Sequence, residues 1–151
     1  MRSRYSAALA TLLVVASIVG IAAAETFGSG VTLPQVTDLG QILQQPQAFE
    51  GRTVRVEGVV TAVCTEMGCW MALGPDAKAG AAELLIQVEH DGKIVFPVGA
   101  KGKRASAQGQ VERISGSPEA QEAAAELGRE KGHEKQEASQ WRVQATGAIV
   151  Y

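Results

Sequence analysis

Apolar and polar residues alternate with a period of two along several stretches of this chain, which is the pattern of half-buried β-strands. The longest stretch begins at Arg52, and one of its faces carries Val54, Val56, Gly58, Val60 and Ala62. Gly58 is a natural position for a β-bulge, because glycine tolerates the bent backbone that a bulge requires. A bulge there would reverse which of the later residues, including Cys64, face the core.

Five further stretches are predicted as strands. A short strand covers Cys69 to Leu73, and Leu84, Ile86 and Val88 alternate in the next one. The polar turn at 90–93 is expected to bring the chain back as a hairpin through Ile94 to Phe96, up to Pro97. Two more strands are expected at 103–114 and 141–151, and the last should place on one face Trp141, Val143, Ala145, Gly147, Ile149 and Tyr151.

Two segments have helical spacing instead. Thr37 or Asp38 is suited to cap a short helix that carries Leu39, Ile42 and Leu43 and stops at Pro46. Ser117 and Pro118 provide a cap and a first-turn proline for a second helix, which Gly128 or Gly132 would end. The apolar stripe of this second helix is weak and consists of Ala120, Ala123, Ala124 and Leu127.

This order of elements predicts a mainly β domain, a small OB-like barrel of five to six strands with a short N-terminal helix and one helix before the last strand. We divide the chain into a leader at 1–24, an N-terminal segment with the short helix at 25–50, and the barrel domain at 51–151. Residues 25–35 are expected to be a loose lead-in.

The first 24 residues have the pattern of a cleavable signal peptide. Arg2 and Arg4 precede an apolar run from Ala7 to Ala23, and three alanines end at Ala24 before Glu25. A retained membrane anchor is the alternative, but this run is at the short limit for a span and ends in a cleavage-like site. We therefore expect export to the periplasm or the medium, with no membrane span after cleavage.

The charge balance argues against some functions. The 151 residues include 14 basic and 16 acidic side chains, and removal of Arg2 and Arg4 would make the chain more acidic. Nucleic-acid binding is not expected, because it relies on many cationic contacts to phosphates. The sequence has no nucleophile elbow, phosphate loop or His-Glu-x-x-His motif, so we name no catalytic residue. We expect no enzymatic activity, because the domain is small and its predicted core has no spare polar residues.

The most informative segment of the predicted mature chain is 64–71, which contains both cysteines, Met67, Met71 and Trp70. Cys64 is expected at the end of one strand and Cys69 at the start of its hairpin partner, on either side of the turn. Paired Cα atoms at such positions lie close enough for a disulfide. An even cysteine count in an exported chain favours that disulfide. In that reading, Trp70 and Met71 are core residues beside the hairpin, or Trp70 contacts a partner.

Two other chemistries stay open for the same segment. Thiolates and thioethers are the ligands that Cu(I) prefers, so Cys64, Met67, Cys69 and Met71 are candidate metal ligands. Strand alternation would place Cys69 and Met71 on one face and Trp70 on the other, which hinders convergence of all four sulfurs. A redox-active thiol pair is the third possibility, although the spacing is longer than Cys-x-x-Cys. No two histidines have the spacing of a zinc site.

Several segments resemble an exported bacterial OB-like family known only as a domain of unknown function. The similarity covers roughly residues 36–151 and rests on the run from Gly51 to Val60, the Val-Phe-Pro at 95–97 and the closing Thr-Gly-Ala-Ile-Val at 146–150. Its distinctive part is the Cys-x-x-x-Gly-Cys-Trp-Met segment at 64–71. The resemblance implies a fold and an export route, but no activity.

These observations lead to one functional hypothesis and two alternatives. We expect an exported, non-enzymatic binding or accessory domain that has a Cys64–Cys69 disulfide and no required cofactor. Its partner would be an envelope protein or a small ligand that the sequence does not identify. The alternatives are a Cu(I)-binding envelope protein and a thiol-disulfide redox protein.

Overall fold

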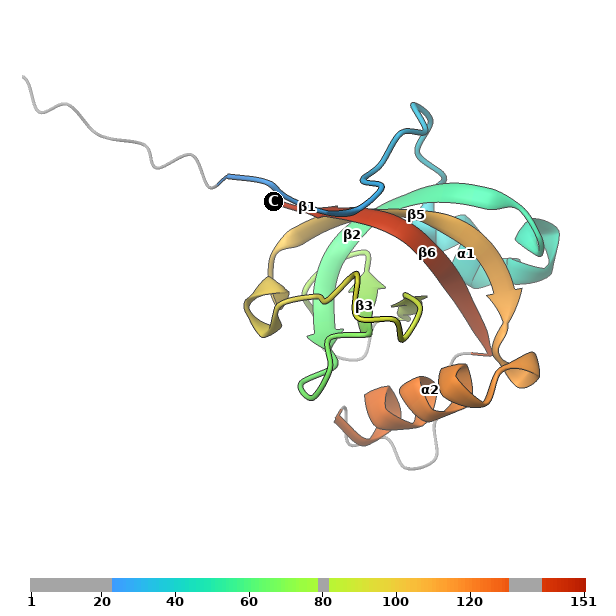
Figure 1. Cartoon of the computed structure of the whole chain (residues 1–151). Coiled ribbons are helices and arrows are strands. Elements are labelled where there is room, and N and C mark those ends of the chain that lie inside the picture. The colour runs from blue at the N-terminus through green and yellow to red at the C-terminus, as the bar shows by residue number, and fades with distance from the viewer. Residues whose placement is uncertain (1–22, 79–81, 131–139) are drawn as a thin grey trace, which may run out of the picture.

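The computed structural model describes residues 23–78, 82–130 and 140–151 and shows a small closed barrel. Five strands form the barrel wall, a sixth pairs with one of these five, and two helices pack against the barrel (Figure 1). The strands are β1 (Glu25–Gly28), β2 (Thr53–Val63), β3 (Trp70–Gly74), β4 (Leu84–Gln87), β5 (Arg104–Arg113) and β6 (Trp141–Val150). The predicted mainly β, OB-like architecture is confirmed.

The strands close the barrel in the order β2–β3–β4–β6–β5, and β5 returns to β2. All these pairs are antiparallel except β4 and β6, which run parallel. β1 adds to the C-terminal half of β6 and lies beside the C-terminus (Figure 1). Residues 25–28 were expected to be a loose lead-in, and this part of the prediction was wrong because their backbone pairs with Gly147 to Val150.

The first helix, α1 (Leu39–Gln44), forms where the sequence predicts it. The carboxylate of Asp38 accepts a 2.8 Å hydrogen bond from the backbone N–H of Gln41, which caps the helix N-terminus. Leu39 and Ile42 are buried in the barrel core, and a 3-10 turn, η1 (Pro46–Phe49), follows. The helix is only six residues long, so it depends on this docking for its stability.

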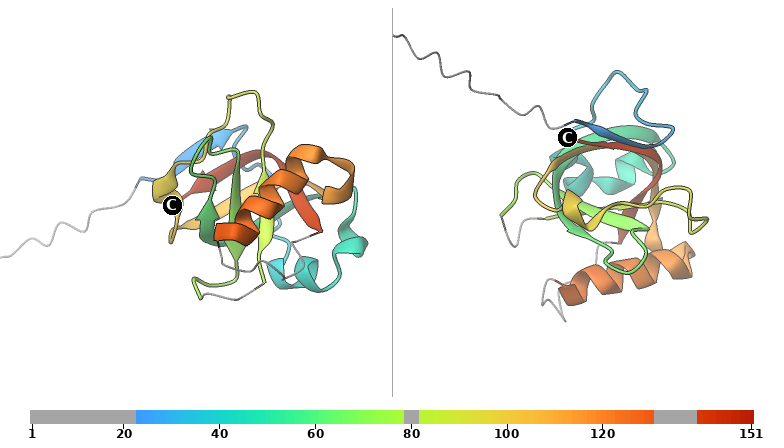
Figure 2. Two further views of the ribbon diagram at one scale, coloured as in Figure 1. Left: turned by 90° about the horizontal axis from the view of Figure 1, so that it is seen from below. Right: turned by 60° about the vertical axis from the view of Figure 1, so that its left-hand side comes forward.

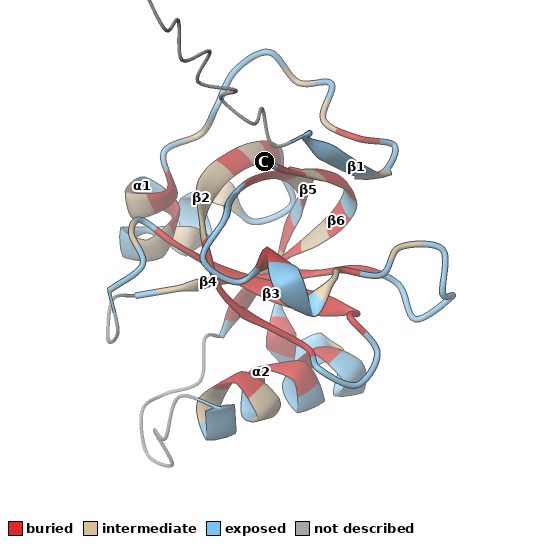
Figure 3. Ribbon diagram, turned by 90° about the vertical axis from the view of Figure 1, so that its left-hand side faces the viewer, coloured by how far each residue is buried: buried red, intermediate tan, exposed pale blue. Residues whose placement is uncertain are grey.

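The second helix, α2 (Pro118–Glu130), lies across the outside of the barrel wall. The views in Figure 2 show it running over β2 and β3, after a short turn, η3 (Ile114–Gly116), that follows β5. The predicted stripe of three alanines and Leu127 is buried against the wall, as Figure 3 shows for the side of α2 that faces the barrel. Gly128 lies inside the helix rather than ending it, and Gly132 falls outside the described residues.

The molecule therefore has two hydrophobic clusters on opposite sides of one wall. The larger fills the barrel and includes Val56, Met71, Ile86 and Phe96. The smaller lies between the wall and α2, and its members are Ala62, Cys64, Cys69, Trp70, Ala72, Leu85, Ile114, Ala120, Ala123, Ala124 and Leu127. Which cluster a strand residue joins depends on the register of its strand.

The expected bulge in the first long strand exists, but at a different position. The β2–β3 register shifts between Val60 and Ala62, whereas Gly58 pairs regularly with Ala105 of β5. The shift reverses the facing, so Val63 enters the barrel and Ala62 and Cys64 join the outer cluster. Gly58 instead permits a close approach, because a Cβ there would lie 2.6 Å from the carbonyl oxygen of Gly74.

A second register shift changes which residues of the last strand face the core. The β5–β6 register changes between Gln108 and Gly109, and on β6 the partners step from Gly147 to Ala145. Ala148 and Val150 therefore enter the core where Ile149 and Tyr151 were expected, and Tyr151 is exposed. Period-two alternation failed here because a bulge adds one residue to one strand only.

The predicted hairpin arm at 94–96 is not a strand. Phe96 is buried, and its N–H donates a 2.8 Å hydrogen bond to the carbonyl oxygen of Gly68, so the segment packs on the β2–β3 turn. β4 pairs with β6 instead of with this segment. Within the described ranges, no helix combines the length and apolarity needed to cross a bilayer.

Candidate functional site

The β2–β3 turn brings the two cysteines together. Cys64 follows the last residue of β2, and Cys69 precedes the first residue of β3. The N–H of Cys64 donates to the carbonyl oxygen of Trp70 at 3.0 Å, and the N–H of Gly68 donates to the carbonyl oxygen of Cys64 at 3.2 Å. These two bonds close a tight turn, as the sequence predicted.

Gly68 is required by this turn for two reasons. Its φ of +60° lies in the left-handed region, which glycine enters without steric cost. In addition, a Cβ at this position would lie 2.5 Å from the carbonyl oxygen of Phe96 and 2.8 Å from the Cγ1 of Val95. The backbone of the turn is thus pressed directly against the segment that carries Val95 and Phe96.

The sulfur atoms of Cys64 and Cys69 are 3.8 Å apart, and both residues are free thiols in this structure. The Cys69 thiol donates toward the Cys64 Sγ, which also accepts a 3.4 Å hydrogen bond from the N–H of Met67. Cys64 is 3% exposed and Cys69 8% exposed. The pair therefore lies almost completely inside the protein, with its sulfurs adjacent.

The environment of the pair disfavours a thiolate at Cys69. Burial, then the hydrogen bond and the charge of neighbouring Cys64, raise the pKa of Cys69 from 9.0 to about 12. The charge of Glu126 adds to this increase. A thiol with so high a pKa is a poor nucleophile near neutral pH, because the thiolate is the reactive form.

Helix α2 covers the thiol pair. Trp70, which follows Cys69, is completely buried between the wall and the helix. Its indole N–H donates a 2.9 Å hydrogen bond to the Oε2 of Glu126, one residue before the buried Leu127. Trp70 is therefore not available for direct contact with a partner while α2 is docked.

The two methionines have different surroundings. Met67 is 55% exposed at the tip of the turn, whereas Met71 is completely buried in the barrel core. The expected pairing of Cys69 with Met71 on one face was wrong, because Cys69 lies outside β3 and joins Trp70 in the outer cluster. Among the described residues, no group of three or more His, Cys, Asp or Glu side chains is arranged to hold a metal ion.

Three features of this site are not evident from the sequence alone. The alanine stripe of α2 indicated a docked helix, but nothing in its spacing identified the surface that it covers. The indole–carboxylate bond to Glu126 likewise joins residues 56 positions apart, which local patterns do not reveal. Val95, 51% exposed and placed against Gly68, was assigned to a strand and not to the turn surface.

Three polar residues, Gln87, Glu112 and Arg142, form a row on the outer face of the barrel wall. Arg142 of β6 donates to the Oε1 of Gln87 at 2.9 Å and to the Oε2 of Glu112 at 3.0 Å. The Nε of Arg142 and the Nε2 of Gln87 are buried and have no hydrogen-bond partner in the structure. Because Glu112 already balances the charge of Arg142, the row needs only a neutral acceptor such as water.

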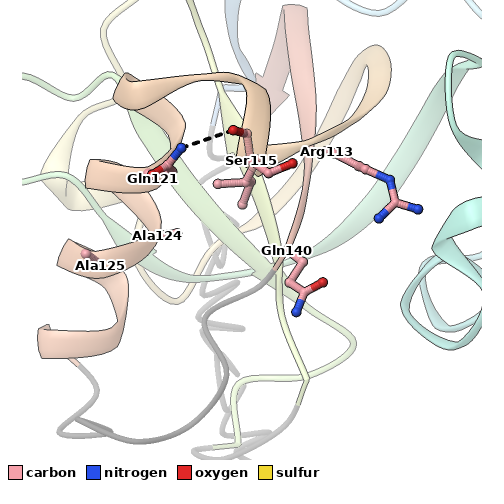
Figure 4. Close-up of a pocket in the computed structure, with 7 residues that line it drawn as sticks. Arg113, Ser115, Gln121, Ala124, Ala125 and Gln140 are labelled. Atoms are coloured by element: carbon pink, nitrogen blue, oxygen red, sulfur yellow. Dashed lines mark hydrogen bonds between the residues drawn. The ribbon is translucent and has the colours of Figure 1, made fainter.

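A cavity of about 390 Å³ lies beside the N-terminal half of α2 (Figure 4). Gln121 reaches across it and donates to the carbonyl oxygen of Ser115 at 3.2 Å. The lining residues are Arg113, Ile114, Ser115, Gln121, Ala124, Ala125 and Gln140.

No family model and no curated protein matches this chain. Among solved structures, the hypothetical protein ygiW from E. coli aligns with a TM-score of 0.40 and 10% identity, over 82% of this chain and 98% of that one. A putative aspartyl-tRNA synthetase from Leishmania major Friedlin aligns with a TM-score of 0.43 and 11% identity, over 82% of this chain and 22% of the other. At these scores, neither similarity supports a conclusion about function.

Proposed function

We propose that this chain is an exported, non-enzymatic OB-like domain that binds a partner through the β2–β3 turn, and that a Cys64–Cys69 disulfide fixes this turn. The observation that carries the proposal is the 3.8 Å separation of the two sulfurs at the ends of paired strands. The arginine-flanked apolar leader supports export, as does the start of β1 at Glu25, directly after the expected cleavage point.

The geometry favours a structural disulfide over the alternatives. Closing the bond moves the sulfurs from 3.8 Å to about 2.05 Å, a small adjustment for two residues already held by the turn. Exported proteins meet oxidising conditions in which such bonds form and persist. A catalytic thiol would instead need an exposed sulfur with a lowered pKa, and Cys69 has the opposite properties.

The turn is also the part of this region that remains accessible. OB barrels commonly bind ligands on the outer face of their second and third strands, which correspond here to β3 and β4. In this protein α2 covers that face and buries Trp70 and Leu85. The neighbouring large apolar side chains left exposed are Met67 and Val95, and methionine adapts readily to different apolar partners.

A photoreactive residue placed at position 67 tests this assignment in the intact envelope. The proposal expects crosslinks to a specific protein from position 67 and none from the control position Val36, which is also exposed but lies before α1. Crosslinks from both positions, or from Val36 alone, would contradict a role for the turn. Absence of crosslinks at both would contradict a protein partner there.

Binding of Cu(I) is the second candidate, because two thiols 3.8 Å apart lie beside the methionine at the tip of the turn. Met71 is separated from them by its place in the barrel core, so a copper set would consist of Cys64, Cys69 and Met67. A Cu(I) titration of the reduced protein tests this set. Met67→Leu should then weaken binding and Met71→Leu should not, whereas equal effects, or no binding at all, would exclude it.

A further inference from the structure

We infer that α2 is a movable cover that controls chemical access to Cys64 and Cys69, and that the hydrogen bond from Trp70 to Glu126 holds it closed. The inference concerns the region of the proposed disulfide, but it applies equally to the reduced protein. It therefore stands or falls independently of whether the disulfide forms after export.

The two thiols are sterically shielded. Both cysteines belong to the cluster between the barrel wall and α2. Only 3% of the surface of Cys64 and 8% of the surface of Cys69 is exposed to solvent. Thiol-disulfide exchange and alkylation both require a reagent to reach a sulfur atom directly. The turn that carries the thiols is joined to the barrel strands and to the 94–96 segment, whereas α2 is the helix of the outer cluster that contains both thiols. Displacement of α2 is thus the smaller structural change that exposes them.

The apolar stripe that holds α2 against the barrel is small. Three of its four buried residues are alanines, and an alanine side chain buries much less apolar surface than leucine or isoleucine. The polar contacts of its described residues include the bond between Trp70 and Glu126 at 2.9 Å, and at the ends of the helix Lys101–Glu130 at 3.0 Å and His90–Glu119 at 3.4 Å. The two ion pairs at the helix ends are exposed and contribute little to the stability of the docked helix.

The hydrogen bond between Trp70 and Glu126 is therefore the main specific restraint on α2. The indole is completely buried, so breaking the bond would leave a buried donor without an acceptor unless the helix moves away. Segments with few apolar contacts open locally at a lower free energy than global unfolding requires. We place α2 in that class, with Glu126 as the residue that sets its opening.

The chemistry that opening permits is ordinary exchange with an external dithiol. A thiolate of the dithiol attacks one sulfur of the Cys64–Cys69 disulfide, forms a mixed disulfide and releases the other cysteine as a thiolate, which takes up a proton. The second thiol of the reagent then attacks the mixed disulfide. The products are the oxidised reagent and two cysteine thiols.

The test measures alkylation of the folded, reduced chain by iodoacetamide at several low urea concentrations. Glu126→Ala removes the bond, and Glu122→Ala is a matched control because Glu122 is an exposed residue of the same helix. We expect Glu126→Ala to accelerate alkylation about tenfold, which corresponds to ~1.4 kcal/mol. Glu122→Ala should leave the rate within twofold of the unmodified chain.

Two further readouts separate opening of α2 from global unfolding. Local opening exposes little surface, so the rate should change only weakly with urea, whereas a globally unfolding route follows the full m-value. Trp70→Phe should accelerate alkylation as Glu126→Ala does, and the double variant should add little more. A rate that follows the full m-value, or equal rates for Glu126→Ala and Glu122→Ala, would overturn the inference.

Discussion

The backbone N–H of Phe96 donates to the carbonyl oxygen of Gly68 at 2.8 Å, which joins the 94–96 segment to the turn that carries the two cysteines. The two backbones are so close that position 68 has no room for a side chain. This contact explains why a stretch that alternates like a hairpin arm does not pair with β4. The segment instead supports the turn from the side of the barrel core.

Replacement of Gly68 by alanine tests this relationship. The variant combines a left-handed φ with a Cβ 2.5 Å from the Phe96 oxygen, so we expect a loss of about 2–4 kcal/mol in the free energy of unfolding. Gly92→Ala is the control, because Gly92 has a similar φ of +72° but open space around it. It should cost only about 1 kcal/mol in urea denaturation. Equal losses would contradict the close contact.

The N-terminal cap of α1 gives a second prediction. Asp38→Ala removes the acceptor for the Gln41 N–H and should lower the free energy of unfolding by about 1 kcal/mol. Asp38→Asn keeps a capping oxygen and should lose much less. If both variants unfold at the same urea concentration, the cap does not contribute as described.

The raised pKa of Cys69 gives the reduced protein a specific pH dependence. The folded state holds this thiol proton more tightly than the unfolded state, so the resulting stability is complete below pH 9 and is lost as the pH rises toward about 12. The oxidised chain has no thiol and serves as the control for lysines and tyrosines. Urea unfolding of both forms should show a steeper alkaline loss for the reduced form, and parallel curves would contradict the assignment.

Oxidation should also change stability at neutral pH. The disulfide would close a loop of only a few residues, so the chain-entropy account predicts a gain of about 2 kcal/mol over the reduced form. The comparison uses the same chain unfolded in urea with and without reductant. A reduced form as stable as the oxidised one would mean that the bond does not stabilise the turn.

Sequence patterns predicted the elements of this fold better than their facing. The Asp38 cap, the stripe of α2 and the period of β2 up to Val60 were correct, because each depends on neighbours along the chain. The facing of Cys64 and Ile149 depended on bulges that a regular alternation does not reveal. The contact between Trp70 and Glu126 depended on where α2 docks, which only the closed barrel determines.

We propose that this domain functions outside the cytoplasm with Cys64 and Cys69 joined. The most direct test is the intact mass of the protein expressed with its leader and purified from the envelope without reductant, together with titration of its free thiols. We predict a chain that begins at Glu25, is lighter by two hydrogens than the dithiol form and has no free thiol. A chain that retains the leader, or one with two free thiols, would contradict the account.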